Sequence, residues 1–164
     1  RMNIERLIQY KLLNSPEIVN LVGRDTGGVP LIRANSNVSG LYPSIVYHEI
    51  AGAGRSGADD DVEMYRHTFE LTYYCDDMEY TEIRDHILRA MYEIGFSQIH
   101  VYTQRNSFTN LIHWTVHVRS VLSRELYDYY MHREKVLYDA TYYKGYKFPI
   151  GKFGTKKSKV LSEQ

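Results

Sequence analysis

The chain has 164 residues, enough for one domain with a sizeable hydrophobic core. Lys and Arg together number 20, and so do Asp and Glu, so the overall charge indicates neither a nucleic acid nor a membrane surface as partner. The single cysteine, Cys75, excludes an internal disulfide framework and a zinc site built from several cysteines.

Two short helices are predicted at the start of the chain. The first begins after Asn3, a suitable N-cap, and its apolar residues recur at helical spacing: Ile4, Leu7, Ile8 and Leu12. Ser15 followed by Pro16 is a typical helix start, because Pro fits the first helical position. We expect this second helix to continue as far as Gly23.

Two strands and a loop are predicted next. Residues 31–35 are a weak strand candidate, and residues 42–50 are a stronger one. The stronger strand is apolar without clean alternation, which is typical of a strand covered on both sides. Small and acidic residues then predict a flexible loop over 51–61.

Residues 62–95 hold the clearest pattern of the chain, a strand that leads into an amphipathic helix. Apolar side chains occupy alternate positions of the strand, as expected when one face is buried: Phe69, Leu71, Tyr73 and Cys75. The helix has an apolar stripe at helical spacing: Tyr80, Ile83, Ile87, Met91 and Ile94. We expect Asp76 to be its N-cap and Gly95 to end it in the left-handed conformation.

A hairpin formed by residues 97–103 and 111–122 completes the predicted sheet. Alternate residues of its second strand are apolar and face inward: Ile112, Trp114, Val116 and Val118. The sequence therefore predicts an α+β fold in the order α-α-β-β-β-α-β-β. Its mainly antiparallel sheet of four to five strands has an amphipathic helix packed on one face. One core should unite the inward residues of both strands with the helix stripe.

The chain changes character at Ser123. Residues 123–138 are expected to form a helix with Ser123 as its cap and an apolar stripe through Leu126, Tyr130 and Leu137. Residues 141–164 contain six lysines and one glutamate, a local charge of +5, without apolar periodicity. We therefore divide the chain into a core domain, residues 2–122, and a Tyr/Lys-rich helix, arm and tail, residues 123–164.

The segment Gly52-Ala-Gly54-Arg-Ser-Gly57 matches the letters of the dinucleotide-binding fingerprint. That motif works by opening a helix whose N-terminus holds a pyrophosphate. Here Ala58, the acidic residues Asp59, Asp60 and Asp61, and then a strand follow instead, which places carboxylates where phosphate oxygens would lie. We predict that this segment binds no nucleotide.

Other polar patterns give no support for catalysis, a cofactor or a metal. His113 and His117 lie on a predicted strand, where four residues span about 13 Å, too far to share one ion. The acidic residues of 59–63 lack the spacing of a calcium loop, and no serine stands in a nucleophile elbow. No apolar run reaches the roughly 20 residues of a membrane helix and no signal-peptide core follows Met2, so we expect folding in the cytoplasm without membrane association.

Aromatic and cationic residues alternate in the C-terminal tail: Tyr142, Tyr143, Tyr146, Lys147 and Phe148. Stacking aromatics with lysines between them can hold single-stranded nucleic acid. The same composition is typical of a segment that orders against a protein partner, since Tyr is enriched at interfaces. We favour the protein partner and take these five residues as its candidate contacts.

The helical start, the segment Leu41-Tyr42-Pro43-Ser44-Ile45-Val46-Tyr47, the variable loop and the strand–helix unit of 62–94 together resemble a known family. This is the tail-completion or tail-terminator family of long-tailed bacteriophages, the minor tail proteins that cap the finished tail tube. The resemblance covers residues 3–121, and the Tyr-rich extension departs from it.

The resemblance implies a non-enzymatic virion protein, assembled in the host cytoplasm. Such proteins form a hexameric ring at the head-proximal end of the tail tube, stop its polymerisation, and present a head–tail joining surface to head completion or neck proteins. Because DNA passes through the ring without specific binding, a lumen-facing loop should not grip phosphates. Arg55 and the acidic residues Asp59, Asp60 and Asp61 are our candidates for that loop.

Two other classes of function stay open at this stage. One is a nucleic-acid-binding module that uses the Lys/Tyr-rich tail. The other is a small enzyme whose site would combine His48, His67 and His86 with the acidic loop. We rank the structural ring protein first, the binding module second and the enzyme third.

Overall fold

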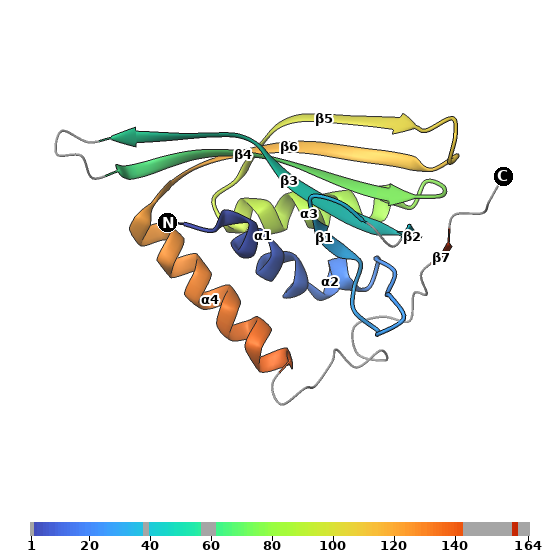
Figure 1. The fold of residues 1–164 in the computed structure, drawn as a ribbon, viewed down its shortest axis with the longest axis horizontal. Coiled ribbons are helices and arrows are strands. Elements are labelled where there is room, and N and C mark those ends of the chain that lie inside the picture. Colours follow the sequence, from blue (N-terminus) through green and yellow to red (C-terminus); the bar gives the residue numbers. More distant parts are fainter. Residues whose placement is uncertain (1, 38–39, 57–61, 143–158, 161–164) are drawn as a thin grey trace.

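The computed structural model describes residues 2–37, 40–56, 62–142 and 159–160. Helices and strands follow one another along the chain, with the labels of Figure 1, as α1 (Ile4–Leu13), α2 (Pro16–Val19), β1 (Ile32–Ala34), β2 (Leu41–Tyr42), β3 (Ser44–Ser56), β4 (Val62–Cys75), α3 (Tyr80–Glu93), β5 (Ser97–Arg105), β6 (Ile112–Ser123), α4 (Arg124–Tyr142) and β7 (Lys159–Val160).

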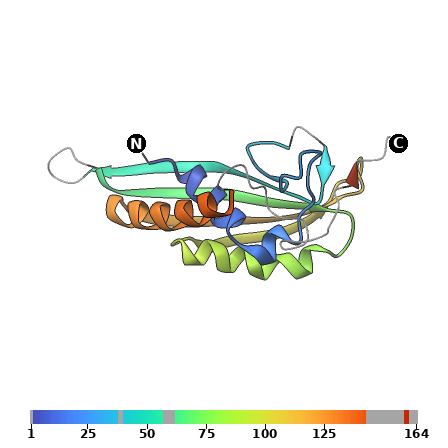
Figure 2. The same cartoon turned by 90° about the horizontal axis from the view of Figure 1, so that it is seen from below.

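A five-stranded sheet in the order β1-β3-β4-β6-β5 organises the molecule. Only β1 and β3 run parallel; the other neighbours are antiparallel. The helices α1, α3 and α4 lie on the same side of this sheet (Figures 1 and 2). The predicted α+β fold is thereby confirmed, with β2, β7 and α4 added to the expected order. None of the helices that the structure describes is both long and apolar enough to span a bilayer.

The core lies between the helices and the inward faces of β4 and β6. Their register places Phe69 opposite Val118, Leu71 opposite Val116, and Tyr73 opposite Trp114. All nine residues predicted for the core belong to one buried cluster, which confirms both the strand alternation and the helix stripe: Phe69, Leu71, Tyr73, Ile83, Ile87, Met91, Trp114, Val116 and Val118.

Two polar atoms within this core are accommodated locally. The hydroxyl of Tyr73 donates a hydrogen bond to the carbonyl of Leu21 at 2.9 Å, so its polar tip is satisfied. Cys75 is a buried free thiol, as expected, and burial raises its pKa to about 11. A thiol that stays protonated at neutral pH is a poor nucleophile, so this cysteine packs rather than reacts.

Several predicted ends of helices are wrong. Helix α3 begins at Tyr80 after a turn, not at Asp76, and its N-cap position, Glu79, makes no side-chain cap bond. Helix α2 ends at Val19, although the sequence favours a longer helix, because the chain must turn for the amide of Gly23 to reach the carbonyl of Pro43 at 2.8 Å. Gly95 does end α3 as expected, with a φ of +87°.

The predicted loop over 51–61 is also shorter than expected. Residues Ala51 to Ser56 belong to β3 and pair with β4, Gly52 opposite His67 and Gly54 opposite Tyr65. Strand β4 needs a hydrogen-bonding partner on this side, and the pairing outweighs the low strand propensity of glycine. A side chain at Gly52 would collide with the Glu49 carboxylate, so glycine leaves room for Glu49 to reach His67 at 3.0 Å.

Helix α4 confirms the predicted helix after Ser123, whose hydroxyl accepts the Leu126 amide hydrogen bond at 3.2 Å. Its predicted stripe is wrong at two of three positions, because Leu126 and Leu137 are exposed while Tyr130 packs against the core. The packed face is different: Tyr127, Tyr130, Met131, Glu134 and Tyr138. The backbone amide of Asn3 donates to the Tyr127 hydroxyl at 2.9 Å, and the rings of Tyr10 and Tyr138 lie 5.0 Å apart. Helix α4 therefore lies along α1, and the division of the chain at Ser123 stays a prediction.

A lysine on α1 joins the three long helices. Lys11 Nζ lies 2.6 Å from Glu93 Oε2 on α3 and 3.4 Å from Glu134 Oε1 on α4. The side chains of Lys11 and Glu134 are only 10% and 3% exposed, whereas that of Glu93 is about half exposed. Asn14 also donates to the backbone carbonyl of Glu134. A buried carboxylate is tolerated only when it is paired, so α4 depends on Lys11.

Replacing a core leucine should lower stability much more than replacing a surface leucine. Leu71 is fully buried, so Leu71→Ala should lower the free energy of unfolding by ~2–5 kcal/mol through lost burial and the cavity left behind. The matched control is Leu137→Ala on the exposed face of α4, which should change it by less than about 0.5 kcal/mol. Urea unfolding measures both, and equal effects would contradict the assignment of the two faces.

Removing the Lys11 ammonium should destabilise the packing of the helices. Lys11→Met leaves the Glu134 carboxylate buried without its cation, a change that costs about 3–5 kcal/mol in comparable buried pairs. Lys135→Met is the matched control, because Lys135 pairs with Asp139 at the surface and should leave stability close to that of the wild type. Thermal unfolding followed by circular dichroism distinguishes the two, and a wild-type transition for Lys11→Met would refute the dependence.

Candidate functional site on the open face of the sheet

The face of the sheet opposite the helices carries polar and aromatic side chains, and we call it the open face. The alternate residues of β4 and β6 that point away from the core form its centre: Thr68, Glu70, Thr72, Tyr74, His113, Thr115, His117 and Arg119. The hydroxyls of Thr72 and Thr115 lie 3.1 Å apart across the two strands. Both threonines are buried, and such cross-strand pairs stabilise the pairing of neighbouring strands.

A carboxylate between two histidines lies near the middle of the open face. His117 Nε2 is 2.8 Å from Glu70 Oε2, and His48 Nε2 is 3.8 Å from Glu70 Oε1. These residues come from β6, β3 and β4, so the register of three strands brings them together. When His117 carries its proton on Nε2, that nitrogen donates a hydrogen bond to the carboxylate. The group therefore places a carboxylate and two imidazole rings side by side.

Aromatic rings from the edge strand β5 extend this group. The ring centroids of His100 and His117 are 5.7 Å apart, and those of Tyr102 and His117 are 6.0 Å apart. His100 and Tyr102 also contact each other, with 5.4 Å between centroids. Rings at such distances favour offset or edge-to-face packing, which gives a rigid surface at low entropic cost. Tyr102 is 38% exposed and is available for contact.

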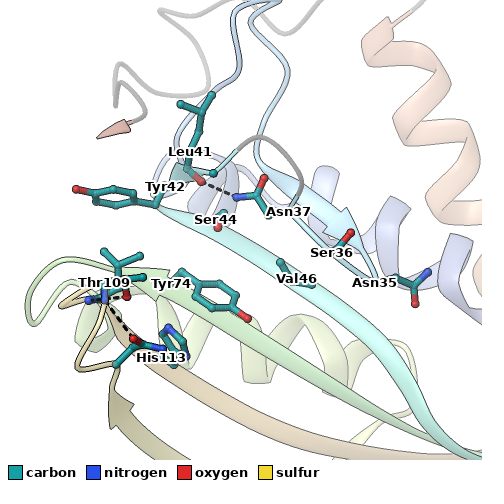
Figure 3. Close-up of a pocket in the computed structure, with 13 residues that line it drawn as sticks. Asn35, Ser36, Asn37, Leu41, Tyr42, Ser44, Val46, Tyr74, Thr109 and His113 are labelled. Atoms are coloured by element: carbon teal, nitrogen blue, oxygen red, sulfur yellow. Dashed lines mark hydrogen bonds between the residues drawn. The ribbon is translucent and has the colours of Figure 1, made fainter. Parts of the chain in front are cut away.

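A pocket of about 330 Å³ lies at the other end of the open face (Figure 3). Amide and hydroxyl side chains from the segment after β1 and from β3 line it together with Tyr42, Tyr74 and His113. Asn37 Nδ2 donates a hydrogen bond to the carbonyl of Leu41 at 2.6 Å, which links two of the residues that line the pocket. The rings of Tyr74 and His113 meet edge to face, with centroids 4.4 Å apart. Most of the lining surface is apolar, contributed among others by Leu41, Val46 and Leu111, so the pocket is suited to apolar and ring contacts with a few hydrogen bonds.

The three histidines of the enzyme alternative do not form one site. His48 lies on the open face, whereas His67 contacts Glu49 on the side of the helices, and His86 is on α3. The acidic residues Asp59, Asp60 and Asp61 lie outside the described residues. Within the described ranges, no group of three or more His, Cys, Asp or Glu side chains has the geometry of a metal site.

Only two of the residues predicted to face a lumen or a partner lie within the described ranges. Arg55 lies near the end of β3, opposite Met64 of β4, and therefore belongs to a strand and not to a loop. Tyr142 is the last residue of α4. The remaining candidates lie outside the described residues: Asp59, Asp60, Asp61, Tyr143, Tyr146, Lys147 and Phe148.

The group of Glu70, His48 and His117 was not predicted from the sequence. Alternation in each strand correctly placed His117 on the polar face of β6 and Glu70 on the polar face of β4. What alternation lacks is the register, which sets Glu70 opposite His117 rather than two residues away. The signal available in the sequence was the alternation itself, applied to two strands at once.

Protonation of His113 should destabilise the fold. Burial lowers the pKa of His113 below its ordinary value of 6.5, so the unfolded chain binds this proton more readily than the folded chain. The stability due to the neutral imidazole is therefore present above pH 6.5 and is lost as the pH falls below it. Urea unfolding at about pH 7.5 and about pH 5.5 should show a larger loss for the wild type than for His113→Gln. Equal losses would contradict this prediction.

The chain matches no protein-family model and no curated protein. The likeness to tail-terminator proteins therefore stays a resemblance, which depends on the segment 41–47 and on the order of helices and strands. That order agrees with the structure, but many unrelated functions share the same kind of α+β fold. Function must accordingly be inferred from the surfaces that the fold leaves open.

Proposed function

We propose that this protein is a structural component of a long-tailed phage virion. It caps the finished tail tube as a ring, ends the polymerisation of the tube and forms the surface to which the head is joined. The observation that supports this most strongly is the one-sided covering of the sheet. Among the described elements, the helices α1, α3 and α4 lie on one side of the sheet (Figures 1 and 2). The other face carries polar and aromatic side chains.

The chemistry of the open face suits contact between proteins better than a reaction. Tyrosine and histidine rings beside hydrogen-bonding side chains are typical of interfaces, where they supply rigid contact area. Both oxygens of the Glu70 carboxylate already face a histidine nitrogen, His117 Nε2 at 2.8 Å and His48 Nε2 at 3.8 Å. The same pairs would orient the rings for a partner, such as the tail tube or a neck protein.

Two further parts of the proposal concern residues at or beyond the ends of the described ranges. The acidic residues Asp59, Asp60 and Asp61 follow the long β3 and would repel duplex DNA in the lumen. The tail after Tyr142 would contact a neighbouring subunit, the tube or a neck protein through its tyrosines and lysines. The pairing of β7 with β2, Leu41 opposite Val160, places one point of this tail beside the segment that carries the resemblance.

Loss of this protein should abolish both the control of tail length and the joining of heads to tails. In a phage that encodes it, a nonsense mutation early in its gene should give tails of uncontrolled length that fail to join heads, because nothing stops the growth of the tube. Electron microscopy of the lysate measures both properties. Complementation with the wild-type chain and with Leu137→Ala, an exposed change, should restore normal particles.

Two outcomes would redirect the proposal. Tails of normal length that remain headless would remove the terminator role and leave a joining role. Salt-dependent binding of short DNA by the purified protein, lost on truncation after Asp139, would instead favour the nucleic-acid-binding module.

A further inference from the structure

We infer that neighbouring copies of this chain join edge to edge, with β5 of one copy pairing antiparallel with the outer edge of β3 of the next. The inference deepens the ring proposed above and rests on it for closure of the ring. It identifies the partner of each edge as a second copy of the same chain. The observations that carry it are the two uncovered edges of the sheet, their equal length and their directions.

Among the described residues, β5 is an uncovered edge over its whole length. In that part of the chain it pairs only with β6, and all but one of its nine residues are exposed. Natural edge strands are usually protected by lysine, proline or a covering segment. The sequence of β5, SQIHVYTQR, has no lysine or proline, and its one charge is the last residue, Arg105. A bulge at Ile99 is the sole interruption, so residues 100–105 form a regular and unprotected edge.

The second uncovered edge belongs to β3. Strand β1 pairs with β3 only from Ile45 to Tyr47, and the Asn35 amide makes the last bond, to the carbonyl of Tyr47 at 2.8 Å. From His48 to Ser56, nine residues including both ends, the described part of the chain pairs β3 with β4 alone. This free segment therefore equals β5 in length. Ile50 within it is 42% exposed and lies at a shift of register in the β3–β4 pairing, so its apolar side chain is available for contact.

The directions of the two edges fit each other. Strand β3 is antiparallel to β4, β4 to β6, and β6 to β5, so β5 runs antiparallel to β3 within one copy. A second copy in the same orientation would thus present its β5 antiparallel to the β3 of the first. Full overlap in this direction sets Ser97 of β5 opposite Ser56 of β3 and Arg105 opposite His48.

The two edges lie at opposite sides of one sheet, and this decides the kind of assembly. A contact between two different surfaces of the same chain is heterologous, so each copy keeps one free edge for the next copy. Such a contact produces a ring when the rotation between copies closes and a filament when it does not. The open faces of all copies would then lie on the same side of the assembled sheet.

Disulfide cross-linking tests the pairing. Full antiparallel overlap puts Ala51 opposite Tyr102, and within each copy these residues align with Thr68 and Thr115 of the open face. We combine Ala51→Cys with Tyr102→Cys, and in two further variants with His100→Cys or Gln104→Cys, which allows a slip of two residues either way. The native Cys75 is buried and should not interfere. Tails assembled with each variant are oxidised and resolved on a non-reducing gel.

At least one double variant should give a ladder of covalent species above the dimer. Each single variant should stay monomeric, because β5 of one copy meets β3 of the next and a single cysteine then has no cysteine opposite it. Ala51→Cys with Tyr92→Cys is the matched control, since Tyr92 is exposed on helix α3 and not on an edge strand, and it should give no ladder. A dimer from Tyr102→Cys alone would show twofold β5–β5 pairing and overturn the inference. So would the absence of a ladder from all three pairs on tails that carry the protein.

The same experiment separates this inference from the proposed function. If antibody labelling finds the protein at the ends of tails but no pair cross-links, the ring stands and its edges are joined otherwise. If the purified variants give the ladder while tails carry no such protein, the edge pairing stands and the terminator role is wrong. Unfolding curves measured for each variant show whether a missing ladder is due to misfolding.

Discussion

The central constraint on this structure is that β4 and β6 are apolar on one face only. Side chains alternate along a strand, so the inward residues of the two strands are brought opposite one another, as Leu71 is with Val116. The sheet gains free energy by burying that face, and the helices α1, α3 and α4 are what bury it. Among the described residues, outward positions of the same two strands carry polar side chains such as Thr72 and Thr115, which do not attract a second apolar layer. The one-sided architecture follows from this alternation.

Three helices on one face must also pack against one another, and Lys11 helps to fix their arrangement. Its ammonium contacts Glu93 of α3 and Glu134 of α4 from a position on α1. Because Glu134 is almost fully buried, the helix that carries it can pack only where this cation is within reach. The pair therefore fixes the placement of α4 on the other two helices. The Tyr127 hydroxyl of α4 accepts a hydrogen bond from the backbone amide of Asn3, just before α1, and so also fixes α4 against α1.

What the helices leave uncovered is where function should be sought. The open face has paired polar groups and packed rings, and two edges of the sheet lack neighbours among the described strands. A protein that worked alone would be expected to protect such edges, because an exposed edge attracts other strands. In a ring they would be satisfied by the next copy. The fold thus fits a subunit that is completed by assembly, which is the role proposed here.

The sequence by itself determined the features that repeat at short range. Alternation assigned the inward residues of β4 and β6, and the helical stripe assigned Ile83, Ile87 and Met91, because these periods reflect local geometry. Tertiary structure decided what local signals could not. Pairing with β4 made a strand of the glycine-rich 51–56, packing against α1 selected Tyr127 and Glu134 over Leu126 and Leu137, and the register of three strands gathered Glu70, His48 and His117. Each of these depends on contacts between residues that are distant in the chain, and short-range periodicity in the sequence cannot predict such contacts.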